Sequence, residues 1–118
     1  MPDSIKDILD NLSKLEEVCA VILISDSGEM MESAKSEEIN LDSIVLLAHR
    51  CVTAGIKVGE ILETSQLKSS FFEFERRNLT LEILKNKYIL ALLAYSKANL
   101  GRIRLELKRN TKLVEALL

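Results

Sequence analysis

Residues 41–64 have the sequence LDSIVLLAHRCVTAGIKVGEILET, which repeats with the period of a long helix that Asn40 or Asp42 can cap. At about 100° per residue, the polar side chains gather in one arc, and nearly all the others are apolar or small. A helix that lies on a sheet needs only one apolar stripe. The surplus apolar surface predicts that the protein works by binding another protein. The polar arc contains Asp42, His49, Arg50, Thr53, Lys57, Glu60 and Thr64.

The apolar surface of this helix divides into two adjacent stripes. The first contains Ile44, Leu47, Cys51, Val58 and Leu62. The second is made of small residues, with Val45 and Ile56 beyond it, and contains Ala48, Val52, Gly55 and Gly59. Each helical glycine costs about 1 kcal/mol relative to alanine, and close approach of another backbone is the common compensation. We expect the small-residue stripe to join the long helices of two copies. The alternative is that it packs on this chain's own sheet.

The flanking segments predict a mixed fold with the order α-β-β-α-β-β-β-α. Residues 18–24 and 88–95 are apolar on both faces, which is typical of central strands. Apolar and polar residues alternate over residues 79–83, which predicts a strand with one solvent-exposed face. Asp26-Ser27-Gly28, Arg77-Asn78 and residues 85–87 are expected to be turns. The remaining elements expected are a helix over residues 4–17 capped by Asp3 or Ser4, strands over residues 29–34 and 66–76, and a helix over residues 98–118.

Short turns make each hairpin antiparallel, so the two doubly apolar strands should lie side by side. The strand over residues 29–34 then falls at one edge and the strand over residues 66–76 at the other. The second edge has no proline and no inward lysine, and such edges tend to pair with another strand. Pairing of two copies there would bring the long helices together across a two-fold axis, which predicts a homodimer. The expected dimer interface consists of Ala48, Val52, Gly55, Gly59, Phe72 and Phe74.

Composition limits the class of protein. The chain has 118 residues, of which 47% are hydrophobic and 29% charged, which predicts one globular domain over residues 1–118. A net charge of −2 argues against nucleic acid as a partner. Cys19 and Cys51 are expected to be buried free thiols in a reducing compartment. Without a signal peptide or a membrane-length apolar run, a cytoplasmic protein is expected, with membrane association only indirect if it occurs.

Enzyme chemistry is not indicated. His49 and Cys51 would lie about 200° apart on the helix, which excludes a local nucleophile pair. One histidine and two separated cysteines do not make a zinc site. We therefore predict no catalytic, cofactor-binding or metal-binding residues.

The last helix is also basic. We expect its basic face to be solvated, and the alternative is that it forms a docking patch or an anionic-membrane patch. Its basic residues are Arg102, Arg104, Lys108, Arg109 and Lys112, which alternate with Glu106 and Glu115.

Two stretches, VCAVILISDSG at residues 18–28 and ANLGRIRLEL at residues 98–107, resemble the Roadblock / dynein light chain family. The glycine in the opening turn of the last helix is similar to the prokaryotic branch. The resemblance extends over nearly the whole chain. It implies an α+β fold in which a five-stranded antiparallel sheet carries the long helix on one face and the two terminal helices on the other.

The resemblance also implies a function. Members of the family form homodimers through the second helix and the third strand, and act as non-enzymatic platforms or regulators for small Ras-like GTPases. By position, the expected partner-binding residues are His49, Arg50, Thr53, Lys57 and Glu60. Some members instead belong to dynein or to lysosomal scaffolds, so a structural adaptor with no GTPase partner remains the alternative. A small-molecule sensor or an enzyme is the least favoured reading.

Overall fold

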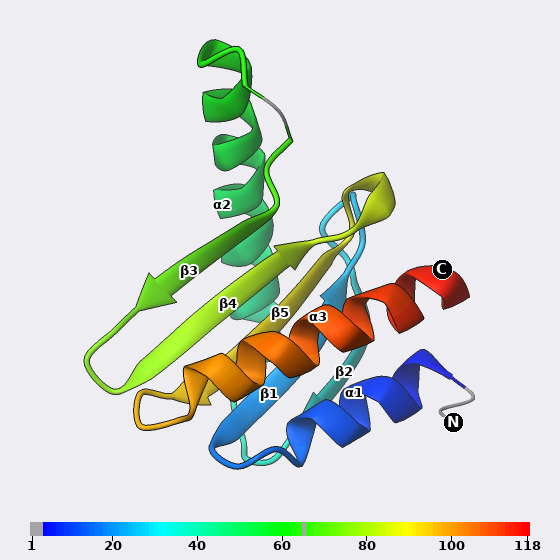
Figure 1. The fold of residues 1–118 in the computed structure, drawn as a ribbon, viewed down its shortest axis with the longest axis vertical. Helices are drawn as coiled ribbons and strands as arrows, with labels where there is room; N and C mark the ends of the chain where they lie inside the picture. Colours follow the sequence, from blue (N-terminus) through cyan, green and yellow to red (C-terminus); the bar gives the residue numbers. More distant parts are fainter. Residues whose placement is uncertain (1–3, 65) are drawn as a thin grey trace.

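The computed structural model describes residues 4–64 and 66–118, which form an antiparallel sheet and the helices packed on it (Figure 1). The strands are β1 (Val18–Ile24), β2 (Met30–Lys35), β3 (Ser69–Glu73), β4 (Arg77–Ile83) and β5 (Ile89–Tyr95). The helices are α1 (Ile5–Ser13), α2 (Leu41–Ile61) and α3 (Leu100–Leu117), with a short 3-10 turn, η1, at Lys85–Lys87. The predicted chain order is confirmed.

The sheet has the strand order β2-β1-β5-β4-β3, with every neighbouring pair antiparallel. All of β1 is buried, and so is β5 up to Ala94, so the two doubly apolar strands lie in the centre as expected. The strands β2 and β3 form the two edges, which confirms both edge predictions.

Helices cover both faces of the sheet, in the arrangement that the family resemblance implied. Helices α1 and α3 lie across one face and α2 lies behind the other (Figure 1). Ile8, Leu12 and Leu107 belong to the core on the first face, and Val45 and Val52 to the core on the second. Apolar side chains alternate between these two cores along β1, which is why its sequence is apolar on both faces.

Side-chain oxygens cap the three helices. Ser4 Oγ accepts a hydrogen bond from the Asp7 backbone N at 3.1 Å. Asn40 Oδ1 accepts from Ser43 N at 3.2 Å, and Asn99 Oδ1 accepts from the N–H of the third residue of α3 at 3.1 Å. The first two caps were expected from the sequence. Both α1 and α2 end a few residues earlier than predicted, at Ser13 and Ile61.

The predicted turn at Arg77-Asn78 is wrong. Both residues belong to β4, where Arg77 pairs with Tyr95 and Asn78 with Ala94. The hairpin bends instead at residues 74–76, where the Phe74 backbone N donates to the Arg77 carbonyl at 2.9 Å. Consequently β3 is shorter than the predicted strand over residues 66–76. Pairing with the central strand β5 overrides the turn preference of asparagine.

The prediction that one face of residues 79–83 is exposed to solvent is also wrong. Thr80 is buried, and Glu82 is partly buried under α3. Burial raises the pKa of the Glu82 carboxyl, while the nearby charges of Lys108 and Arg104 lower it. Polar residues on a strand therefore do not indicate solvent here, because a basic helix covers them. On α3 itself, Leu113 and Leu117 are exposed, whereas Ile103, Leu107 and Val114 are buried.

Glu37, in the loop between β2 and α2, connects this loop to the sheet. Its Oε1 accepts a hydrogen bond from Tyr95 Oη at 2.7 Å, and its Oε2 lies 3.6 Å from Arg77 Nη2. The Arg77 guanidinium also lies over the Tyr95 ring, 5.1 Å from its centroid. The hydrogen bonds from Tyr95 and then Cys19, with the Arg77 charge, hold the pKa of Glu37 below its ordinary value of 4.5. This cluster helps to position the start of α2.

The cluster predicts a pH-dependent contribution to stability. Because the pKa of Glu37 is lower in the folded chain, its contribution is present above pH 4.5 and is lost as the pH falls below that value. Glu37→Gln should lower the free energy of unfolding at neutral pH, and the difference from wild type should shrink in acid. Urea unfolding at several pH values measures this difference in the free energy of unfolding. The matched control is Glu38→Gln, because Glu38 is exposed in an ion pair with Lys35 and should change little at any pH. Equal effects of the two substitutions would contradict this role of Glu37.

Candidate protein-interaction surface

The small-residue stripe of α2 packs on this chain's own sheet. Ala48 is 2% exposed and Val52 is 3% exposed, and both belong to the core beneath α2. Their expected place in the interface between two copies is therefore corrected, and the alternative considered for the stripe holds. The physical reason is that small side chains allow α2 to lie close to β1 and β5, whose own side chains fill the space between the layers.

The helical glycines are adjacent to the segment that enters β3. A Cβ added at Gly55 would lie 2.9 Å from Leu67 Cδ2, so the leucine occupies the space that the missing side chain leaves. Gly59 lines a cavity together with Leu67 and Ile83. The close approach predicted from Gly55 therefore exists, but its partner is a segment of the same chain.

The first apolar stripe of α2 remains uncovered. We call Leu47, Cys51, Val58, Ile61 and Leu62 the exposed stripe, because each of these side chains is exposed to solvent. Ile44, at one margin of this stripe, is partly buried against the core. The C-terminal half of α2 extends beyond the sheet, so no strand lies under it (Figure 1). A continuous apolar stripe of this kind is typical of a protein-interaction surface.

The outer edge of β3 lies at the margin of the sheet (Figure 1), because β3 pairs with β4 on its other side. Phe72 is partly buried against the core beneath α2, whereas Phe74 is exposed. Phe74 borders a shallow depression of about 520 Å³ that also includes Ile39 and Ile44, near the start of α2. Apolar side chains therefore lie beside the outer edge of β3.

Of the five residues predicted to bind a partner, Arg50, Thr53, Lys57 and Glu60 are exposed. His49 differs from them. Its Nε2 lies 2.9 Å from the Asp26 carbonyl oxygen, and its ring packs against Gly28, where a Cβ would approach within 3.0 Å. Gly28 has a φ of 91°, which favours glycine. His49 therefore supports the β1–β2 turn, and the accessible part of the predicted partner surface begins at Arg50.

Bulk is the signal that distinguishes the two stripes in the sequence. The covered stripe contains alanine, valine and glycine, and the uncovered one contains leucine and isoleucine together with Cys51 and Val58. The close contact of the small residues is made by Leu67 and the strands of the same chain, not by a second copy. Leu67 itself was not identified as a packing residue.

The two cysteines are in opposite environments, although both were expected to be buried. Cys19 is buried, and burial first, then its hydrogen bond with Glu37, raises the pKa of its thiol to about 11. Cys51 is exposed within the exposed stripe. Across residues 4–64 and 66–118, no three His, Cys, Asp or Glu side chains are grouped so that they could hold a metal ion. None of the helices in that part of the chain is long and apolar enough to cross a membrane.

Comparison with known proteins shows likeness in structure rather than in sequence. No protein-family model matches the chain, and no curated protein matches it. The fold is similar to that of MglB from Myxococcus xanthus, with a TM-score of 0.87 and 20% identity over 94% of this chain and 91% of that one. A second MglB structure, with a tetrameric arrangement, has a TM-score of 0.86 and 17% identity over 94% and 85% of the two chains.

A Roadblock/LC7 domain from Streptomyces avermitilis is similar to the same degree. Its TM-score is 0.87, with 16% identity over 97% of both chains. Sequence identities this low establish similarity of fold alone. Together with the strand order and the helices on each face, these comparisons show that the chain has the Roadblock/LC7 fold that the sequence resemblance implied.

Proposed function

We propose that this chain is a non-catalytic, homodimeric regulator or scaffold that binds a small Ras-like GTPase. The exposed stripe of α2, with the outer edge of β3 beside it, is the observation that carries the proposal. The structural likeness of the chain to MglB also supports the proposal. The family that the sequence resembles is expected to consist of platforms or regulators for small Ras-like GTPases. We take residues 1–118 as one Roadblock-like domain that acts in the cytoplasm.

The proposed dimer uses the surfaces that the chain leaves uncovered. Antiparallel pairing of two β3 edges would extend the sheet across a two-fold axis and bring the two α2 helices together. The exposed stripe and Phe74 would then be removed from water, at about 25 cal/mol for each Å² of apolar area. Gly55 and Gly59 lie beside this contact rather than at its centre. One MglB structure has a tetrameric arrangement, which supports self-association for this fold.

The polar arc is the surface proposed for the GTPase. Arg50, Lys57 and Glu60 lie next to the exposed stripe around α2, so dimerisation through the stripe would leave them accessible. Paired helices would present two such arcs side by side. Charged side chains at the rim of an interface steer association and select the partner. His49 is assigned to the fold and contributes only indirectly, by positioning the first turns of α2 on the β1–β2 turn.

A second candidate is a structural adaptor with no GTPase partner. The outer edge of β3 favours it, because an extended segment of another protein can add to such an edge as a further strand. This role would compete with homodimerisation for the same backbone groups. The two functions therefore differ in what occupies β3.

The first prediction concerns the dimer. Val58→Glu should convert a dimer to a monomer, because it would bury an unpaired carboxylate, weakening association by about 2 kcal/mol or more, roughly thirtyfold. Light scattering at tens of micromolar measures the mass. Leu105→Glu is the matched control, since Leu105 lies on α3 and is 50% exposed against 53% for Val58. A wild-type protein that is already monomeric at this concentration would rule out the dimer.

The second prediction uses the two thiols. At low concentration Cys51 should react rapidly with a thiol reagent, and its rate should fall as the concentration rises, because the dimer covers the exposed stripe. Cys19 should react slowly throughout, since it is buried and its pKa is raised to about 11. Cys51→Ser should abolish the fast phase. If the fast rate stays constant across the concentrations where the mass changes, the dimer does not use this stripe.

The third prediction concerns the GTPase. A Ras-like GTPase from the same genome, loaded with GDP or a GTP analogue, should bind in one nucleotide state. Arg50→Glu or Lys57→Glu should weaken binding about tenfold with the dimer intact. Lys14→Glu, at the end of α1 on the other face, is the control. Wild-type affinity in both arc variants would exclude this surface, and no binding in either nucleotide state would favour the adaptor.

A further inference from the structure

A cavity of about 720 Å³ lies between the C-terminal half of α2, the segment that enters β3, the β4–β5 turn and the end of α3. It is on the side of α2 that carries Ile56 and Gly59, whereas Leu47 and Val58 of the exposed stripe lie on another side of the helix. The proposed dimer would therefore leave the cavity open. Its volume is in the range of pockets that hold a ligand or several side chains of a peptide.

The cavity has an apolar floor. Ile56 of α2, Leu67 and Ile83 of β4 are all partly buried and line it. Gly59 also lines it, at a helical position where glycine lowers helix stability. Gly59 leaves this part of the cavity lining without a side chain. The second helical glycine, which the core packing of α2 does not explain, thus maintains an open space.

Three lysines line the cavity around this floor. Lys68 precedes β3, and Lys85 and Lys87 belong to the β4–β5 turn. None of the three forms an ion pair with a carboxylate of residues 4–64 or 66–118. Glu115 is nearby, but its Oε2 accepts a hydrogen bond from the Lys85 backbone N at 2.7 Å. Glu60 also lines the cavity, so the lining holds three lysines and two carboxylates and is net positive in a chain of net charge −2.

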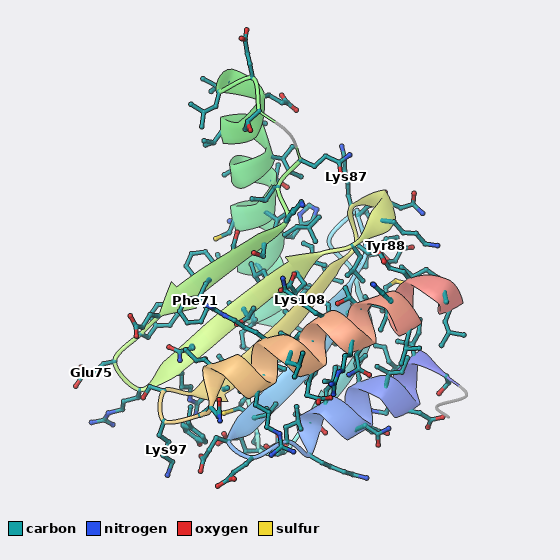
Figure 2. All side chains as sticks on the ribbon, viewed as in Figure 1. Phe71, Glu75, Lys87, Tyr88, Lys97 and Lys108 are labelled. Carbon is teal, nitrogen blue, oxygen red and sulfur yellow. The ribbon has the colours of Figure 1, made fainter. Side chains whose placement is uncertain are left out.

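The backbone around Lys87 adds a second observation. Asn86 and Lys87 have φ values of 60° and 62°, and the Leu84 backbone N donates to the Tyr88 carbonyl at 2.7 Å, which closes the turn over residues 85–87. A positive φ favours glycine, and lysine is strained there. Figure 2 shows Lys87 at the turn that closes this end of the sheet. Strain of this kind is concentrated at functional sites.

We propose that this cavity binds an acidic segment of a partner protein, with leucine-like side chains on the floor and carboxylates against Lys68, Lys85 and Lys87. The lysines come from two separate segments, so they fit an extended ligand with several carboxylates better than a single small anion. The site is additional to the GTPase surface, although Glu60 borders both. Electrostatic attraction supplies the preference for acidic segments, and the floor supplies apolar burial.

The test uses a fluorescein-labelled amphipathic peptide of glutamate and leucine, measured by fluorescence anisotropy with the full chain. Binding should be saturable and should weaken with added salt. A counterpart with lysine in place of each glutamate should not bind. Gly59→Leu should reduce affinity more than tenfold by filling the cavity, and the substitution favours the helix. Lys87→Gly should reduce affinity about tenfold while the melting temperature stays the same or rises, because the strain at residue 87 is relieved.

Matched variants separate this site from the rest of the molecule. Lys14→Gly removes the same charge at the far face and should leave affinity unchanged. Lys87→Arg should restore binding, which a purely structural effect of the turn would not do. The proposal is overturned if the acidic peptide does not saturate, if the lysine peptide binds equally well, or if folded Gly59→Leu and Lys87→Gly bind as wild type. These outcomes are independent of whether the protein dimerises or binds a GTPase.

Discussion

The close packing of α2 on the sheet is the contact on which the rest of the structure depends. Ala48 and Val52 are small enough to bring the helix close to the central strands, and Gly55 leaves room for Leu67. Because this side of α2 meets the sheet, Leu47, Val58 and the other residues of the exposed stripe are left on a different side. The same packing that stabilises the monomer therefore creates the surface proposed for a partner.

Each side of α2 thus has its own role in the proposed function. One side forms core, the exposed stripe is assigned to a second copy, and the polar arc is assigned to a GTPase. The C-terminal half also contributes the wall of the lysine-lined cavity. A single helix can take part in all of these because it extends beyond the sheet, which leaves most of its circumference free of the chain's own layers (Figure 1).

Much of the fold could be predicted because its signals are local or depend on simple periodicity. The doubly apolar segments identified β1 and β5, and Ser4 and Asn40 were expected as caps. The errors lie where a neighbouring element overrides a local preference. Asn78 favours a turn but pairs with Ala94 in β4, and Thr80 is polar but is covered by the helical layer. Of the expected interface residues, Phe74 is exposed, whereas Ala48 and Val52 are in the core.

By itself, the sequence determined the order of the elements, the two central strands and the presence of more apolar surface on α2 than one sheet can cover. These follow from side-chain type and spacing, which the chain carries in any conformation. Only the tertiary structure decided which stripe of α2 is covered. That choice depends on how closely two layers approach. Leu67 lies fifteen residues after Val52, the last buried residue of α2, and it contacts the position of Gly55 only after the chain folds back. The tertiary structure likewise decided that one cavity is lined by Lys68, Lys85 and Lys87, because their segments meet only through strand pairing.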